Sequence, residues 1–139
     1  KQREGNRSVL AGVPRGLPAL IKANRVQEKV RAVGFDWDFR DQIWDKVREE
    51  LDELQDEVKA GNRDAIEQEF GDLLFSVVNA ARLYNIDPET ALERTNRKFI
   101  DRFEYLEKQT LRKGRSLKDM DLDEMNAIWE QAKKYDRKT

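Results

Sequence analysis

Residues 49–72 read EELDELQDEVKAGNRDAIEQEFGD, and the rest of the fold is expected to form around them. Apolar residues recur every three or four positions on both sides of Gly61-Asn62, a pattern that indicates amphipathic helices. We therefore predict one helix over residues 38–60 and a second over residues 63–84. Because the break between them is short, the two helices are expected to pack antiparallel as a hairpin.

The chain on both sides of this hairpin is also expected to be helical, over residues 17–33, 88–112 and 121–134. No strand pattern, internal repeat or low-complexity tract interrupts the series. We predict an all-α fold, an antiparallel bundle of about five helices, whose wide apolar faces favour a dimer. The boundary signals are Asp38, Asp87-Pro88 and the capping box of Asp121 with Glu124 at N-termini, and Gly34, Gly61 and Gly114 at C-termini.

The length of 139 residues suits one domain, which we place at residues 17–134. An extended arm or linker is expected at residues 1–16 and a frayed tail at residues 135–139. Charged residues make up 40% of the chain, and no apolar run approaches the ~20 residues of a membrane span. We therefore expect a water-soluble protein without a membrane partner. A net charge of −1 disfavours a polynucleotide partner.

The absence of histidine and cysteine narrows the chemistry that the chain can perform. Zinc, copper and non-haem iron sites rely on imidazole or thiolate ligands, and serine or cysteine nucleophiles need a histidine base in the common triads. A di-iron four-helix protein is disfavoured for the same reason. Any metal must use oxygen ligands, which points to Mg²⁺ or Mn²⁺ and less to Ca²⁺. The lack of cysteine also fits a cytoplasmic protein.

Four acidic residues are placed to face one another in the hairpin. Glu50 and Glu53 share one face of the first helix, and Glu69 and Asp72 share one face of the second. Antiparallel packing would set the two pairs opposite each other, where they repel unless a cation lies between them. Glu50 falls about 70° from the centre of its apolar stripe, and Glu69 about 100° from the centre of its own. Glu57 also lies at the rim of a stripe, so spacing alone leaves a metal site and a solvated face equally open.

Gly71 lies between two of these acids, inside the second helix of the predicted hairpin. A glycine in a helix interior costs about 1 kcal/mol relative to alanine, and close approach of a backbone or a ligand is the usual reason for keeping one. A tolerated glycine without a function is an equally good interpretation.

The ordered pattern of EExxE at residues 49–53 and ExxD at residues 69–72 resembles the signature of the all-α nucleoside triphosphate pyrophosphohydrolases. More narrowly, it resembles the C-terminal domain of the MazG family. The stretches VPRGLPAL, VGFDW, EFGDLLFSVVNAAR, NRKFIDRF and IWEQAKK extend the resemblance over residues 13–134. Ala65 departs from the pattern, because MazG relatives can carry a lysine there. This departure concerns one possible nucleotide contact of the family and leaves the metal site unaffected.

The resemblance implies antiparallel helices that dimerise and a Mg²⁺-dependent hydrolysis of nucleoside triphosphates, with Mn²⁺ as an alternative metal. Water would attack the α-phosphorus and release a nucleoside monophosphate and pyrophosphate. Either Glu49 or Glu53 would orient or deprotonate that water, and the sequence does not distinguish between them. The implied metal ligands are Glu50, Glu53, Glu69 and Asp72, the implied catalytic residues are Glu49 and Glu53, and the implied nucleotide contacts are Lys46, Glu49, Lys98, Arg102, Trp129 and Lys133.

A triphosphate carries about four negative charges, so cationic side chains should approach the same site. Lys98 and Arg102 lie four residues apart on one predicted helix, and Trp129 and Lys133 repeat this spacing on the last helix. Taken alone, these pairs indicate an exposed basic face and a core tryptophan packed near Ile128. The resemblance favours nucleotide contact instead, with Trp129 stacking on a base or sugar.

Two other functions stay open. The bundle could be a catalytically inactive nucleotide-binding or protein-interaction module, or a narrower house-cleaning pyrophosphatase for dUTP or a modified nucleotide. Phe35 and Trp37 could line a base pocket, although packing in the core is the favoured interpretation. The expected partners are nucleoside triphosphates and a second copy of the chain.

Overall fold

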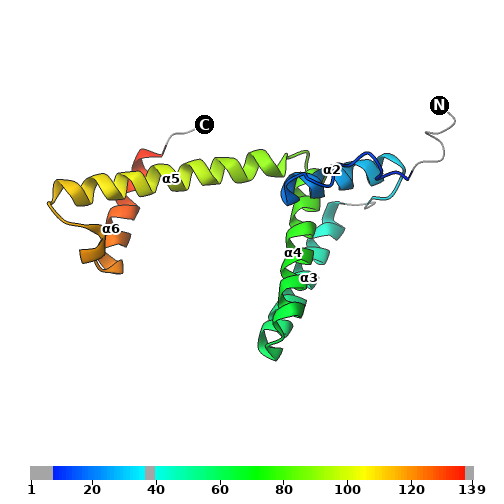
Figure 1. Ribbon diagram of the computed structural model, residues 1–139, viewed down its shortest axis with the longest axis horizontal. Coiled ribbons are helices and arrows are strands. Elements are labelled where there is room, and N and C mark those ends of the chain that lie inside the picture. Colours follow the sequence, from blue (N-terminus) through cyan, green and yellow to red (C-terminus); the bar gives the residue numbers. More distant parts are fainter. Residues whose placement is uncertain (1–7, 37–39, 137–139) are drawn as a thin grey trace. The chain divides into compact units, whose positions relative to one another are not determined.

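A computed structural model describes residues 8–36 and 40–136 of the chain. Within these ranges all regular structure is helical and five α-helices are present, so the all-α prediction is confirmed. None of the described helices has the length and apolar character needed to cross a bilayer. The helices are α2 (Ala19–Ala32), α3 (Arg40–Ala60), α4 (Arg63–Leu83), α5 (Pro88–Arg112) and α6 (Leu122–Ala132), with the 3₁₀ turns η1 (Leu117–Asp119) and η2 (Lys133–Tyr135) (Figure 1).

The chain divides into two compact units, Lys1–Glu89 and Thr90–Thr139. The first unit contains α2, α3 and α4, and the second contains nearly all of α5 together with η1, α6 and η2. The single helical domain expected over residues 17–134 stays a prediction.

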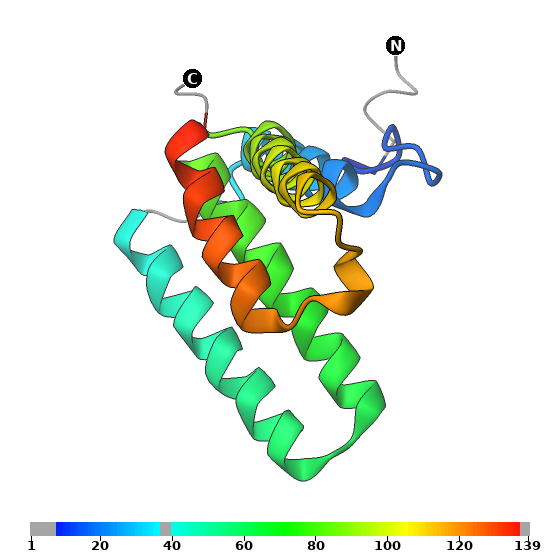
Figure 2. The same ribbon diagram turned by 90° about the vertical axis from the view of Figure 1, so that its left-hand side faces the viewer.

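Helices α3 and α4 form the predicted hairpin and lie side by side along their length (Figures 1 and 2). Gly61 follows α3 in the left-handed region at φ +79°, which glycine adopts without a steric penalty. Asn62 then caps α4, because its side chain accepts a hydrogen bond from the backbone N–H of Ala65 at 3.2 Å. The side chains of Ile43 and Leu54 on α3 are buried. Local turn chemistry and the apolar stripe therefore act together to close the hairpin.

Helix α2 packs on α4 and ends at the predicted glycine cap. Gly34 has φ +93°, and the N–H of Phe35 donates to the carbonyl oxygen of Val30 at 3.0 Å, which satisfies a carbonyl of the last turn. The N-cap predicted for α3, Asp38, lies outside the described residues.

In the second unit, α6 packs on α5 around a small apolar core of Leu106, Met120 and Ile128. The predicted capping box is present at the start of α6. The Asp121 carboxylate accepts the N–H of Glu124 at 2.8 Å, and the Glu124 carboxylate accepts the N–H of Asp121 at 3.5 Å. The chain therefore turns from η1 into α6 at a residue that the sequence alone identified.

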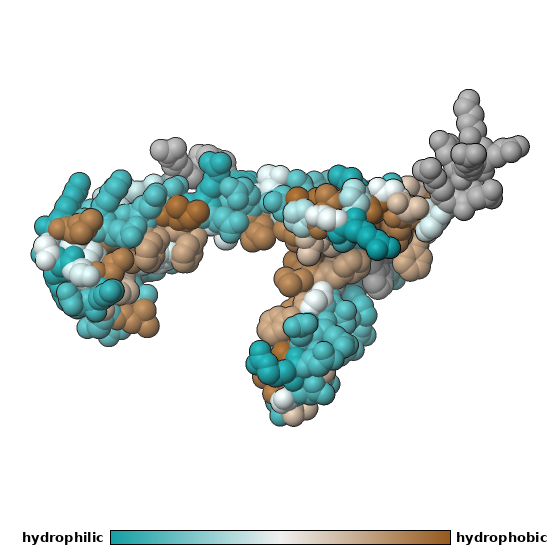
Figure 3. Space-filling view, viewed as in Figure 1, coloured by the Kyte–Doolittle hydropathy of each residue, from teal (hydrophilic) through white to brown (hydrophobic). Residues whose placement is uncertain are grey.

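Part of the apolar stripe predicted for the hairpin is exposed. Ile43 and Val78 are buried, whereas Phe70 and Leu74 on α4 are 49% and 60% exposed. Figure 3 shows such apolar side chains at the surface of the hairpin. Contiguous exposed apolar residues are typical of a surface that contacts another molecule. Further exposed apolar residues of the hairpin are Leu51, Val58, Phe75 and Val77.

The surroundings of Gly71 are open. A Cβ atom built at this position meets no atom of the described chain within 4 Å, apart from the helix's own backbone. Close approach by another segment of this chain therefore does not explain the glycine.

We expect Gly71→Ala to raise the free energy of unfolding by up to about 1 kcal/mol, because alanine has the higher helix propensity and meets no steric obstacle here. Gly61→Ala should lower it by about 1 kcal/mol or more, since Gly61 has φ +79°. Urea denaturation followed by circular dichroism measures both changes. A destabilised Gly71→Ala variant would contradict the open environment of this position.

Candidate active site

Three carboxylates from the two helices of the hairpin come together. Oxygen atoms of Glu50, Glu69 and Asp72 all lie within 4.8 Å of one another. Helix α3 carries the first of these acids and α4 carries the other two, so the cluster exists only because the hairpin is closed. Glu50 is 6% exposed, Glu69 is half-buried and Asp72 is exposed. The fourth predicted ligand, Glu53, is exposed and lies outside this group of three.

Lys46 neutralises part of this charge. Its Nζ donates to Glu50 Oε1 at 2.9 Å and to Glu49 Oε2 at 2.7 Å. The hydrogen bonds to Glu49 and then to Glu50 raise the pKa of Lys46, so the ammonium group is charged at neutral pH. One lysine is shared by two carboxylates, and Glu50 Oε2 is buried without a hydrogen-bond partner among the described residues.

The negative charge of Glu69 is less well compensated than that of Glu50. Its Oε2 is also buried, and the described part of the chain offers it no hydrogen-bond partner. Burial raises the pKa of Glu69, and the negative charges of Glu53, Asp72 and Glu50 raise it further. A buried carboxylate oxygen without a partner is costly, and two of them in one cluster fit a bound cation. Because all the donors are carboxylate oxygens, the cluster suits a hard divalent cation.

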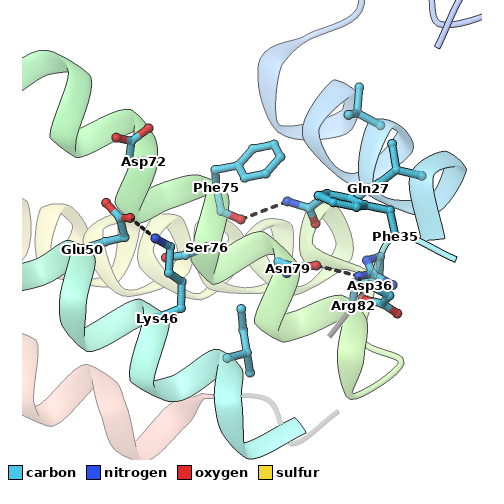
Figure 4. A pocket seen from close by; sticks show the side chains of 13 residues that line it. Gln27, Phe35, Asp36, Lys46, Glu50, Asp72, Phe75, Ser76, Asn79 and Arg82 are labelled. Atoms are coloured by element: carbon cyan, nitrogen blue, oxygen red, sulfur yellow. Dashed lines mark hydrogen bonds and ion pairs between the residues drawn. The ribbon is translucent and has the colours of Figure 1, made fainter. Parts of the chain in front are cut away.

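A pocket of about 640 Å³ opens beside the cluster, between α2, α3 and α4 (Figure 4). Glu50 and Asp72 lie at one end of the pocket, and Asp36 and Arg82 lie at the other. This volume is in the range of pockets that hold small organic ligands. The remaining lining residues are the apolar Val26, Val30, Phe35, Ile43 and Phe75 and the polar Gln27, Lys46, Ser76 and Asn79.

Sequence reasoning does not single out Gln27 and Arg82, two buried polar residues of this pocket. Gln27 Nε2 donates to the carbonyl oxygen of Phe75 at 3.0 Å, which ties α2 to α4. Arg82 Nη2 donates to Asp36 Oδ1 at 2.8 Å. A signal was available, because Arg82 follows the buried Val78 by four residues and therefore lies on the same helix face.

Phe35 lines the pocket but does not pack in the core. The residue is 77% exposed, so the interpretation of Phe35 as a core residue is wrong. The physical reason is its position directly after the glycine cap of α2, where the chain has left the helix that packs on α4. Trp37, the other residue of that interpretation, lies outside the described residues.

In the second unit, Trp129 lies against α5. Its ring centroid is 5.0 Å from that of Phe99, and the guanidinium carbon of Arg102 lies 5.9 Å from the Trp129 ring centroid. Trp129 is half-buried, and in the described part of this unit it belongs neither to the apolar core of Leu106, Met120 and Ile128 nor to the partly buried side chains packed against that core.

The cations predicted to contact the nucleotide in this unit differ in their surroundings. Arg102 forms a bidentate ion pair with Asp136. Lys133 Nζ lies 2.8 Å from Glu130 Oε2, and Lys98 is exposed. The first unit thus holds the predicted metal ligands and the second holds these cations, and the roles of both groups stay predictions.

The hairpin, the oxygen-only cluster and the adjoining pocket define an all-α protein with an acidic cluster whose chemistry suits a hard cation. Residues 41–106 match the family described as the MazG nucleotide pyrophosphohydrolase domain, and this range contains all four predicted metal ligands. The chain belongs to the MazG family.

Three curated relatives are similar to the chain. It is 42% identical to the nucleoside triphosphate pyrophosphohydrolase/pyrophosphatase MazG of Thermotoga maritima over 117 residues, which is 84% of this chain and 45% of that protein. It is 37% identical to the nucleoside triphosphate pyrophosphohydrolase of Escherichia coli over 138 residues, 98% of this chain and 52% of that protein. It is 46% identical to the uncharacterized protein YabN of Bacillus subtilis over 133 residues, 95% of this chain and 27% of that protein. The chain therefore spans about half the length of the first two relatives.

We expect Glu69→Gln to raise the melting temperature of the metal-free protein at neutral pH. The folded state raises the pKa of Glu69, so the ionised carboxylate destabilises the fold as the pH rises through that pKa, and glutamine removes this effect. The gain should vanish as the pH falls below about 4, where the wild-type carboxyl is protonated as well. Thermal melts in the presence of EDTA across this pH range measure the difference.

The matched control is Glu67→Gln, a change at an exposed glutamate of the same helix, which should leave the melting temperature nearly unchanged. Added Mg²⁺ should stabilise the wild-type protein more than Glu69→Gln, because a ligand that binds only the folded state raises its stability. If metal-free Glu69→Gln melts at a lower temperature than the metal-free wild-type protein at neutral pH, the ionised Glu69 carboxylate does not destabilise the fold.

Proposed function

We propose that this chain hydrolyses nucleoside triphosphates, ribose or deoxyribose, at the α-phosphorus to a nucleoside monophosphate and pyrophosphate, in a reaction that requires Mg²⁺. The observation that carries this proposal is the convergence of Glu50, Glu69 and Asp72 on the α3–α4 hairpin. The relatives named as nucleoside triphosphate pyrophosphohydrolases support the same activity. A catalytically inactive module is not favoured, because the chain retains every acid of the EExxE and ExxD patterns.

The acidic cluster fits Mg²⁺ as the metal. Glu50, Glu69 and Asp72 would hold it, and Glu53 would serve as the fourth ligand. Buried carboxylate oxygens without a partner suit a hard cation that prefers oxygen, and Mn²⁺ meets the same requirement. When bound, such an ion polarises phosphate oxygens and makes water a better nucleophile at neutral pH.

Two neighbouring side chains have roles available to them in this reaction. Lys46 is charged and contacts two carboxylates, so it can exchange one of them for a phosphate oxygen of the substrate. Glu49 is exposed beside Lys46 and can orient the attacking water or take its proton. Glu53 is the other candidate for this base.

The pocket beside the cluster suits the nucleoside part of the substrate, because apolar walls and a few polar groups are typical of sites for small organic ligands. The exposed ring of Phe35 is one of these walls. In the second unit, we assign Lys98, Arg102 and Lys133 to phosphate binding. Trp129 would stack on a base or sugar.

A homodimer in the cytoplasm completes this proposal. Dimerisation would bury apolar side chains of the hairpin that are exposed in the single chain, among them Phe70 and Leu74. A sequence without cysteine fits a reducing compartment. A net charge of −1 provides no field to attract a polynucleotide.

We expect Glu50→Gln and Glu69→Gln each to abolish pyrophosphate release from nucleoside triphosphates. Loss of a ligand to a catalytic ion removes several kcal/mol of transition-state stabilisation, which corresponds to a decrease in kcat/KM of more than about a hundredfold. A pyrophosphate-release assay with Mg²⁺ across the common ribo- and deoxyribonucleoside triphosphates measures this loss, and also reports base preference.

The matched control is Glu57→Gln, a substitution at a half-buried glutamate of α3 that lies outside the three-carboxylate group. This variant should retain activity, and all three variants should keep a helical circular dichroism spectrum. Full activity of both Glu50→Gln and Glu69→Gln would refute the metal assignment. If the wild-type protein releases no pyrophosphate from any of these nucleoside triphosphates, the proposed reaction is refuted.

A further inference from the structure

The guanidinium group of Arg102 is held by a carboxylate of its own chain. Its Nε lies 3.0 Å from each carboxylate oxygen of Asp136, and its Nη2 donates to the same carboxylate. The two side chains are 18% and 24% exposed, so the pair is largely shielded from water. Bidentate pairs of arginine with a carboxylate are among the stronger polar contacts in proteins.

The same carboxylate lies among further cations. The hydrogen bonds from Arg102 lower the pKa of Asp136, and the positive charges of Lys98 and Lys133 lower it further, so Asp136 is ionised at neutral pH. Arg102 is also held over the ring of Trp129. The three cations that we assign to phosphate binding in this unit, Lys98, Arg102 and Lys133, therefore all interact electrostatically with the Asp136 carboxylate.

Carboxylate and phosphate oxygens bind to arginine through the same donors. The N–H groups of Nε and Nη2 form a planar fork that accommodates two oxygens, and Asp136 engages both nitrogens. We propose that Asp136 is an internal competitor for the fork of Arg102, and that a phosphate group of the substrate displaces it on binding. This inference rests on the proposed function, which assigns Arg102 to the nucleotide.

The position of Asp136 allows this displacement without unfolding a helix. Asp136 follows η2, and its backbone N–H donates to the carbonyl oxygen of Lys133 at 3.3 Å, a long hydrogen bond. Tyr135 stacks on Tyr105 with ring centroids 5.4 Å apart, which holds the turn on α5 while the Asp136 side chain rotates. A hollow of about 430 Å³, lined by both Arg102 and Asp136, leaves room for that movement.

The test is the affinity of the full chain for inorganic tripolyphosphate, measured by isothermal titration calorimetry without metal. Asp136→Asn keeps the shape of the side chain and removes its charge. We expect it to bind tripolyphosphate about two- to fivefold more tightly than wild type, the range that an ion pair near the protein surface contributes. KM for nucleoside triphosphates should fall by the same factor with kcat unchanged.

Three variants isolate the cause. Asp136→Glu keeps the charge and should bind as wild type does, and Asp123→Asn removes an exposed carboxylate of α6 and should have no effect. Adding Arg102→Gln to Asp136→Asn should cancel the gain, because the released fork is then missing. Circular dichroism checks that each variant is folded.

Equal or weaker tripolyphosphate binding by Asp136→Asn would overturn the proposal, and weaker binding would assign Asp136 to positioning Arg102 instead. A gain of the same size in Asp136→Glu would also overturn it. The titration involves no turnover, so its result stands if the protein hydrolyses no nucleotide. If the wild-type protein hydrolyses nucleoside triphosphates and Asp136→Asn binds tripolyphosphate as wild type does, Asp136 is not a competitor for Arg102. The proposed reaction would then still stand.

Discussion

Closure of the α3–α4 hairpin is the contact on which the candidate site depends. Burial of apolar side chains draws the two helices together, and the same packing brings oxygens of Glu50, Glu69 and Asp72 within 4.8 Å of one another. Apolar burial and charge repulsion therefore act in opposite directions at one interface. Lys46 relieves only part of the repulsion, because it is shared between Glu50 and Glu49. The fold thus creates a local excess of negative charge that a divalent cation would offset.

Cations proposed to meet phosphate are already paired with acids in both units. Lys46 contacts Glu49 and Glu50, and Arg102 contacts Asp136. The chain has a net charge of −1, so it provides no surplus of positive charge to attract a triphosphate. Binding would instead exchange internal carboxylates for phosphate oxygens, and its free energy would be the difference between two charge-assisted contacts. Such an exchange favours ligands with several negative charges over singly charged ones.

Helices and their ends could be predicted from the sequence because they depend on neighbours along the chain. The box of Asp121 with Glu124 and the left-handed Gly34 and Gly61 each satisfy or free backbone groups within about one helical turn. Phe35 shows where such reasoning stops. Its aromatic ring suggested the core, yet the position after a helix cap leaves it exposed.

The sequence by itself determined the helices, most of their boundaries and the oxygen-only chemistry open to the acids. Tertiary structure alone decided which of those acids are shielded from water. Glu50 and Glu53 share a helix face, yet Glu50 is buried and Glu53 is exposed. Gln27 bonds to a carbonyl 48 residues away, and Arg102 pairs with Asp136, 34 residues later. No local pattern encodes these partners, because burial and charge pairing depend on which segments meet after the helices have packed.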